Sequence, residues 1–172
     1  AATETKCFTF IETVKADKNT LNSNETRKKY PFINTCKNLA PFLNEIRTKF
    51  VHSDEVRAEL VTLIDSPGII EEGPDYTKAC IDIADNVDFI FFLIDPIQQL
   101  QQSRTKGLLK VFCEKHWQKL HIFLTKEDIV FAADKKDGTD AKGKITSSIA
   151  SSISDIVKAK DYVPDIRWIS TE

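Results

Sequence analysis

At 172 residues, the chain has the length of one domain and can bury a core without disulfides or metals. Its 24 basic and 26 acidic residues nearly cancel, which argues against nucleic acid as a partner. The longest apolar run, residues 89–94, is too short to cross a bilayer, and no signal peptide opens the chain. The four cysteines show no C-x-x-C pattern, which favours reduced thiols. We therefore expect a soluble, cytoplasmic piece, and the lack of any Met suggests a fragment of something longer.

The first third of the chain predicts one strand and one helix. Residues 7–14 are rich in β-forming side chains and indicate a strand, whereas the polar residues 15–29 indicate an exposed excursion. Apolar residues then recur at the spacing of an amphipathic helix, at Leu39, Phe42, Leu43, Ile46 and Phe50. Asn38 suits the cap of this helix, with Pro41 tolerated in its first turn.

The rest of the chain alternates between strands and helices. Short apolar runs predict strands at residues 60–64, 87–94, 120–124 and 166–169. Periodic patterns predict helices at residues 76–84, 103–117 and 145–157. Such an alternation predicts an α/β sandwich with a mainly parallel sheet and right-handed crossovers.

The strand at residues 60–64 ends in Asp65, Ser66, Pro67 and Gly68, a DxxG pattern. Ligands of parallel sheets bind beyond the carboxyl ends of the strands, so Asp65 is expected to lie near a ligand. A carboxylate there suits the water shell of Mg²⁺, and the Gly68 amide can approach a terminal phosphate closely. Taken alone, the same residues also fit an ordinary turn after a strand.

A second motif follows the strand at residues 120–124, which runs directly into Thr125, Lys126, Glu127 and Asp128. This is an [NT]KxD pattern. A carboxylate at its last position can accept two parallel hydrogen bonds from guanine, while the Lys stem lies over the base. Because both motifs end strands and stand in this order, coincidence is much less credible than for either alone.

With these motifs in this order, the chain resembles the GTPase domain of the dynamin superfamily, and it looks closest to the EHD ATPases and the mitofusins. Asp65 to Gly68, followed by Ile69, is similar to the DTPGI of the EHD branch and the DSPG of mitofusins. Thr5, with the Lys-Cys-Phe that follows, resembles the segment that carries the switch I threonine. The resemblance implies a P-loop GTPase-like three-layer sandwich over residues 1–172, from switch I to the last strand.

The resemblance also implies roles for individual residues in Mg²⁺-dependent hydrolysis of GTP. Thr5 would meet Mg²⁺ and the γ-phosphate, Asp65 would hold the water shell of the metal, and Gly68 would sense the γ-phosphate. The other nucleotide-binding residues implied are Ser66, Pro67, Thr125, Lys126, Asp128 and Ser170. The implied partners are GTP or ATP, a second copy through the nucleotide face, and a membrane reached through regions outside this chain.

The main departure from the family lies at the start of the chain. A complete member carries a first strand and a GxxxxGK[ST] loop before the switch threonine, whereas only four residues precede Thr5. We therefore expect that strand and loop to be missing from this chain. Residues 138–144 spell GxxxxGK, but Ile145 replaces the Mg²⁺-binding hydroxyl, so this segment is interpreted as a connection.

Three alternatives to a GTPase stay open. The EHD branch uses ATP despite an NKxD-type motif, so an ATP-using domain is one. A degenerate GTPase fold that binds no nucleotide and serves as a protein-interaction scaffold is another, and the missing loop favours it. A flavodoxin-like or response-regulator module also predicts acidic strand ends, but it leaves the TKED motif unexplained.

Overall fold

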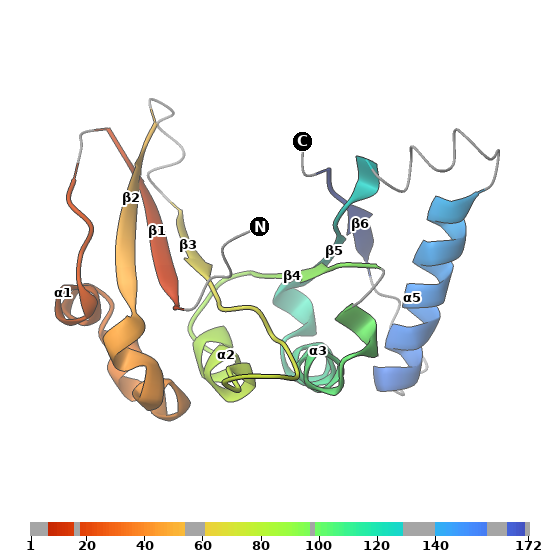
Figure 1. The fold of residues 1–172 in the computed structure, drawn as a ribbon, viewed down its shortest axis with the longest axis horizontal. Coiled ribbons are helices and arrows are strands. Elements are labelled where there is room, and N and C mark those ends of the chain that lie inside the picture. The colour runs from red at the N-terminus through yellow and green to blue at the C-terminus, as the bar shows by residue number, and fades with distance from the viewer. Residues whose placement is uncertain are drawn as a thin grey trace. The chain divides into compact units, whose positions relative to one another are not determined.

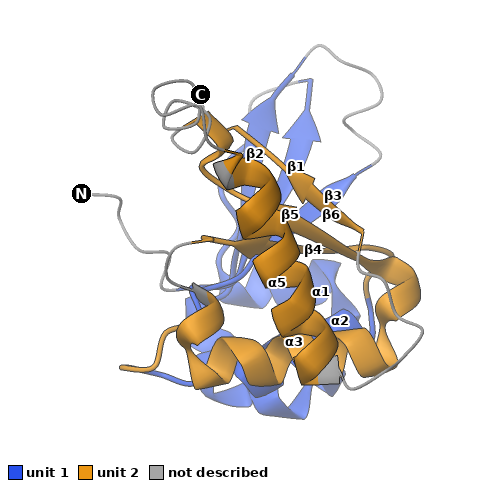
Figure 2. Ribbon diagram, turned by 90° about the vertical axis from the view of Figure 1, so that its right-hand side faces the viewer, with its two compact units in different colours: residues 1–69, 74–86 blue, residues 70–73, 87–172 orange. Residues whose placement is uncertain are grey.

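The computed structural model describes residues 7–15, 18–53, 61–96, 99–128, 140–157 and 165–170. The chain divides into two compact units (Figure 2). The first comprises residues 1–69 and 74–86, and the second comprises residues 70–73 and 87–172. Each unit contains a three-stranded sheet with helices, so the fold is mixed α/β. A single GTPase domain over residues 1–172 stays a prediction.

The first unit is built around a sheet with the strand order β2-β1-β3 (Figure 1). Its elements are β1 (Thr9–Val14), α1 (Ser23–Lys29), the 3₁₀ helices η1 (Pro31–Thr35) and η2 (Lys37–Glu45), β2 (Arg47–His52), β3 (Thr62–Asp65) and α2 (Thr77–Ala84). Its core is formed by large apolar side chains that are fully buried: Phe8, Phe10, Ile33, Leu39 and Ile46.

The predicted amphipathic helix over Leu39 to Phe50 is correct only in its first part, which is helical but of the 3₁₀ type. The structure has η2 in the first part and strand β2 in the second. A spacing of four, as between Ile46 and Phe50, fits both one helical turn and two steps of a strand. The intervening Thr48 decides for the strand, because it is also buried and its hydroxyl lies 2.9 Å from that of Thr26.

The predicted excursion at residues 15–29 contains a helix, α1, that the sequence analysis missed. Its signal is a capping box, in which the Glu25 amide donates to Asn22 Oδ1 and the Asn22 amide donates to Glu25 Oε2. The N-x-x-E spacing was available in the sequence. A short polar helix lacks the long apolar stripe by which helices are usually found.

Strand β3 differs from its prediction as a buried strand of a parallel sheet. It pairs antiparallel with β1, whereas β1 and β2 are parallel. Within the described residues β3 is an edge strand, so Val61 and Leu63 are exposed rather than buried. Of the four strand pairings seen among the described residues, three are parallel, so a mainly parallel arrangement is found, but not at this strand.

The second unit has a fully parallel sheet with the strand order β4-β5-β6. Its elements are β4 (Ile90–Ile94), η4 (Gln99–Gln101), α3 (Ser103–Lys115), η5 (Trp117–Lys119), β5 (Leu120–Leu124), α5 (Ala141–Val157) and β6 (Ile166–Trp168). These elements match the predicted strands and helices closely. In the part of the chain that the structure describes, no helix is long and apolar enough to cross a membrane.

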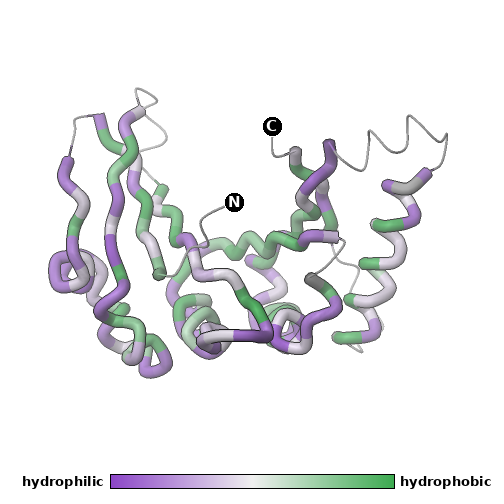
Figure 3. Tube along the Cα trace, viewed as in Figure 1, coloured by the Kyte–Doolittle hydropathy of each residue, from purple (hydrophilic) through white to green (hydrophobic). Residues whose placement is uncertain are grey.

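Strand β4 is apolar along its whole length, as Figure 3 shows. Side chains that point to one face are buried, and Phe92 packs edge-on against Phe112 of α3 at a centroid distance of 6.0 Å. Side chains on the other face, Phe89, Phe91 and Leu93, are exposed. The two faces of one strand thus offer a matched test of burial.

Replacing Phe92 by Ala is expected to lower the free energy of unfolding by about 3–5 kcal/mol, because it opens a cavity against α3. Phe92 is 8% exposed and Phe91 is 55% exposed. The Phe91→Ala control loses only ring contacts with His121 and Phe123, so its effect should be roughly 1 kcal/mol. Chemical denaturation of both variants measures the difference, and equal losses would contradict the one-sided burial.

Candidate functional site

The carboxyl ends of the three parallel strands of the second unit are joined directly. The Thr125 amide, after β5, donates to the carbonyl of Ile94 at 3.0 Å, and the Ile169 amide, after β6, donates to the carbonyl of Leu124 at 2.9 Å. Parallel strands present these ends at one edge, where ligands of such sheets bind. The predicted residues Thr125, Lys126, Asp128 and Ser170 all lie in the segments that follow β5 and β6 at this edge.

Lys126 has an unusual backbone, with a φ of 61° in the left-handed region. For a residue with a Cβ this conformation costs about 1–2 kcal/mol, so other contacts must hold it. Its ammonium nitrogen lies 2.6 Å from Oδ2 of Asp95, the first residue after β4. The sequence analysis missed this partner, because an Asp-Pro pair after a strand has the pattern of an ordinary strand end.

Glu127 links the same loop to β6 and α5. Its amide donates to the carbonyl of Ile169, and its carboxylate pairs with Lys142 near the start of α5. The Lys142 ammonium also lies 5.7 Å from the ring centroid of Trp168 in β6, and the Trp168 indole donates to Thr146 of α5 at 2.9 Å. The loop is therefore fixed from two sides.

These contacts bear on the GxxxxGK pattern at residues 138–144, of which residues 138–139 lie outside the described part. Lys142 is paired with Glu127, and the Asp140 carboxylate accepts from the Gly143 amide at 2.9 Å. Asp140 thus caps the start of α5 with a negative charge, where a bound phosphate would need free amides. This geometry supports the interpretation as a connection.

Asp128, which follows β5 at this edge, has a buried side-chain oxygen that needs an explanation. Its Oδ1 is buried and has no hydrogen-bond partner within the described ranges. Leaving a buried polar atom unsatisfied is costly, and each such atom calls for an explanation. A ligand that brings N–H donors to this oxygen would remove the cost.

The DxxG residues lie in the first unit, at the end of β3. Asp65, Ser66 and Gly68 are exposed, while Pro67 is buried. A Cβ added at Gly68 would meet nothing within 4 Å, so packing does not require glycine there. Burial raises the pKa of the Cys80 thiol to about 12, and a hydrogen bond with Ser66 partly offsets this shift.

Residues 70–73, just beyond this motif, belong to the second unit and contact the start of α3. The Glu71 carboxylate accepts from the Arg104 amide at 2.9 Å and from the Ser103 hydroxyl at 3.1 Å, at the start of α3. The Arg104 guanidinium in turn donates to the carbonyls of Ile70 and Gly73. The hydrogen bond from the Arg104 amide is the main reason that the pKa of Glu71 is lowered.

The predicted site residues therefore fall into two sets. The DxxG residues belong to the first unit, and the TKED residues with Ser170 belong to the second. Thr5 lies outside the described residues. Among the described residues, no three His, Cys, Asp or Glu side chains are grouped to hold a metal. Mg²⁺ usually takes one or two carboxylates together with substrate phosphates, so the single exposed Asp65 fits only that arrangement.

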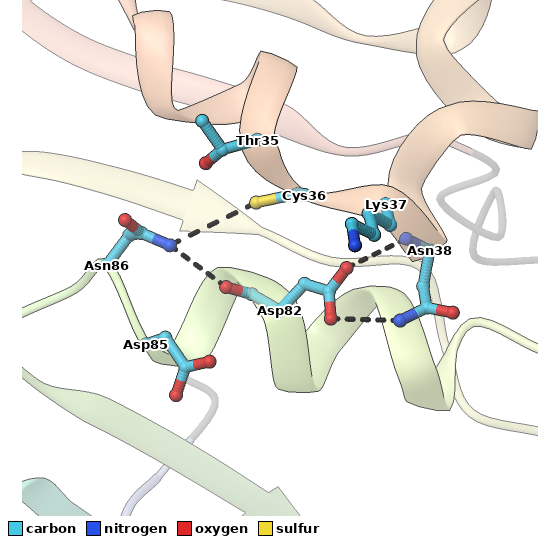
Figure 4. A pocket seen from close by; sticks show the side chains of 7 residues that line it. All are labelled: Thr35, Cys36, Lys37, Asn38, Asp82, Asp85 and Asn86. Carbon is cyan, nitrogen blue, oxygen red and sulfur yellow. Dashed lines mark hydrogen bonds between the residues drawn. The ribbon is translucent and has the colours of Figure 1, made fainter.

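A separate hollow of about 250 Å³ lies in the first unit (Figure 4). It is lined by residues that the sequence did not point to as a binding site: Thr35, Cys36, Lys37, Asn38, Asp82, Asp85 and Asn86. The Asp82 carboxylate accepts from the amide and the side chain of Asn38, at 2.8 and 2.9 Å. Burial raises the pKa of the Cys36 thiol, and the nearby charges of Asp82 and Asp85 raise it further. Because Asp82 already has partners within the protein, this hollow points to a structural contact between η2 and α2.

Among known proteins, a similarity to this chain was found in solved structures. No protein family and no curated protein matches the chain. A solved structure from work on an oligomerised bacterial dynamin pair, concerned with long-range sensing and tethering of membranes, is similar over 96% of this chain, with 15% identity and a TM-score of 0.49. This chain spans 28% of the length of that one. The strand-end geometry, rather than this likeness, supports the function proposed next.

Proposed function

We propose that the loops at the carboxyl ends of β4, β5 and β6 bind the base of a guanine nucleotide. The observation that carries this proposal is Oδ1 of Asp128, which is buried and has no hydrogen-bond partner in the described part of the chain. Guanine presents a ring N–H and an exocyclic amine side by side, and an ionised carboxylate accepts both in parallel. Adenine offers a ring acceptor in place of the N–H and would leave the same oxygen without a donor.

Lys126 completes the base site in this proposal. Its ammonium is drawn to Asp95, so its apolar stem is available to lie along the face of the base. Thr125 and Ser170 line the same edge of the sheet. Asp128 thus reads the base and Lys126 covers it.

For the first unit we propose, by resemblance, a role in binding Mg²⁺ and phosphate. Asp65 would order the water shell of Mg²⁺, Gly68 would place its amide near the terminal phosphate, and Thr5 would close over both, with Ser66 and Pro67 in the same loop. The open space at Gly68 supports this role, because nothing in the described protein itself requires a glycine there. Mg²⁺, when bound, would neutralise negative charge on the phosphates.

In the intact protein we infer Mg²⁺-dependent hydrolysis of GTP in a dynamin-like, P-loop GTPase-like domain. Homodimerisation through the nucleotide face and membrane remodelling from a peripheral, cytoplasmic position belong to this proposal by resemblance. ATP is the alternative nucleotide. A non-catalytic scaffold is the alternative function.

Binding calorimetry of the intact protein with guanosine diphosphate and adenosine diphosphate tests the proposal. We expect a clear preference for the guanine nucleotide. The 172-residue chain alone should bind either one with a dissociation constant of roughly 1 mM or weaker, because its sequence holds no complete GxxxxGK[ST] loop to supply phosphate contacts. Micromolar binding by this chain alone would assign the phosphates to another loop, and equal affinities in the intact protein would contradict the base site.

A further inference from the structure

We propose that Asp95 is a positioning residue of the base site, which holds Lys126 and thereby presets Asp128 before the ligand arrives. The inference rests on the proposed function and deepens it, because it names what sets the preference for guanine. The pair joins residues 31 positions apart in the chain, on the loops after two neighbouring strands.

First, Asp95 contacts Lys126 directly. Oδ2 of Asp95 lies 2.6 Å from the Lys126 ammonium, which is short for a charge-assisted hydrogen bond. The Asp95 side chain is only 16% exposed, so its charge is partly withdrawn from water and depends on a partner. The pair stands beside the hydrogen bond from the Thr125 amide to the carbonyl of Ile94, which fixes the two loops relative to each other.

The second observation is the backbone at Lys126. A left-handed residue redirects the chain, so the place of Asp128, two residues further on, depends on the φ of Lys126. This conformation is unfavourable for a side chain with a Cβ and needs a compensating contact. The ion pair with Asp95, just after β4, stabilises this conformation of Lys126.

The third observation concerns Asp128. Its buried oxygen lacks a partner within the described ranges, so the loop holds an arrangement that the free protein would not favour by itself. Glu127, between the two residues, is also tied, through its pair with Lys142. Asp95 and Lys142 therefore hold neighbouring residues of the loop, and Asp95 is the one that contacts Lys126, the residue proposed to cover the base.

The test uses the intact protein with Asp95→Asn, which keeps the size of the side chain and removes its charge. Calorimetry with guanosine, guanosine diphosphate and adenosine diphosphate separates the base from the phosphates. We expect roughly tenfold weaker binding of guanosine diphosphate, as for the loss of one charged hydrogen bond, and a similar fall in the guanine-over-adenine ratio. Glu114→Gln is the control, because it removes an exposed ion pair with Lys110 on α3 and should change neither value.

A double-mutant cycle then shows whether Asp95 acts through Lys126. Lys126→Met keeps an apolar stem but removes the ammonium, so the double variant should lose no more than the larger single loss. Additive losses would overturn the positioning role. If Asp95→Asn does not fold, Lys126→Met alone decides, and an unchanged guanine-over-adenine ratio in that variant contradicts the inference.

The two proposals fail in different ways. If the parent protein binds no guanine nucleotide, the proposed function is wrong and the role of Asp95 falls with it. If the parent binds guanine with preference and Asp95→Asn retains both affinity and preference, the base site stands and Asp95 is not its positioning residue.

Discussion

Replacing Asp128 by Asn in the intact protein is expected to weaken GTP binding about a hundredfold or more. The variant keeps one neutral acceptor oxygen, but it loses the second hydrogen bond and the negative charge that strengthens both, each charged bond being worth about 1.5–3 kcal/mol. It should gain xanthine nucleotides, because xanthine carries a carbonyl where guanine has its amine, and the new amide can donate to that carbonyl. Stability of the free protein should change little, since the replaced oxygen has no partner within the described residues.

Competition binding with guanosine, xanthosine and adenosine diphosphates measures this exchange. Asp155→Asn is a matched control, because Asp155 lies exposed on α5 in the same unit. Unchanged affinities for all three nucleotides in Asp128→Asn would remove Asp128 from the base site.

Replacing Asp65 by Ala is expected to abolish Mg²⁺-dependent hydrolysis in the intact protein while leaving the fold in place. The carboxylate is exposed at the end of β3, and exposed substitutions usually change stability by less than about 0.5 kcal/mol. Phosphate release and thermal melts, with and without Mg²⁺ and nucleotide, measure the two effects.

Asp88→Ala is the control for this variant, because Asp88 is an exposed acid that precedes a strand instead of following one. A scaffold without catalysis predicts that Asp65 stabilises the turn, so the Asp65 variant would melt earlier with no activity to lose. An Asp65 variant that hydrolyses nucleotide at the parent rate would contradict the proposed mechanism.

Sequence periodicity predicted the second unit well because its elements are regular. Residues 120–124 form β5 as predicted, and the helix that was expected to begin at Ser103 does so. Both β4 and β5 are short apolar runs bounded by polar residues or proline, and such runs predict strands even though β4 is buried on one face only.

The errors fall where a sequence pattern has two physical solutions. The spacing of Ile46 and Phe50 suits a helix and a strand alike, and tertiary pairing with β1 selects the strand. The run before Asp65 has the composition of a central strand, whereas its place in the sheet depends on which strands lie beside it.

In the candidate site, too, some features could be predicted from the sequence and others depend on the fold. Asp65, Gly68, Lys126 and Asp128 could be named from their motifs, because each motif stands at the end of a strand and holds chemically specific residues. The pairing of Lys126 with Asp95 could not, since it depends on β4 and β5 being neighbours in parallel register. The buried state of Asp128 Oδ1 likewise arises from the packing of the loop and leaves no mark in the sequence.

The central claim is that the loop at residues 125–128 receives a guanine base, and amide NMR of the intact protein during titration with guanosine tests it most directly. Guanosine carries no phosphate, so shifts report the base and ribose alone. The account predicts saturable shifts centred on Lys126 and Asp128, with smaller ones at Asp95 and Ser170, and none of this size with adenosine. Shifts confined to the hollow between η2 and α2, or equal responses to both nucleosides, would contradict it.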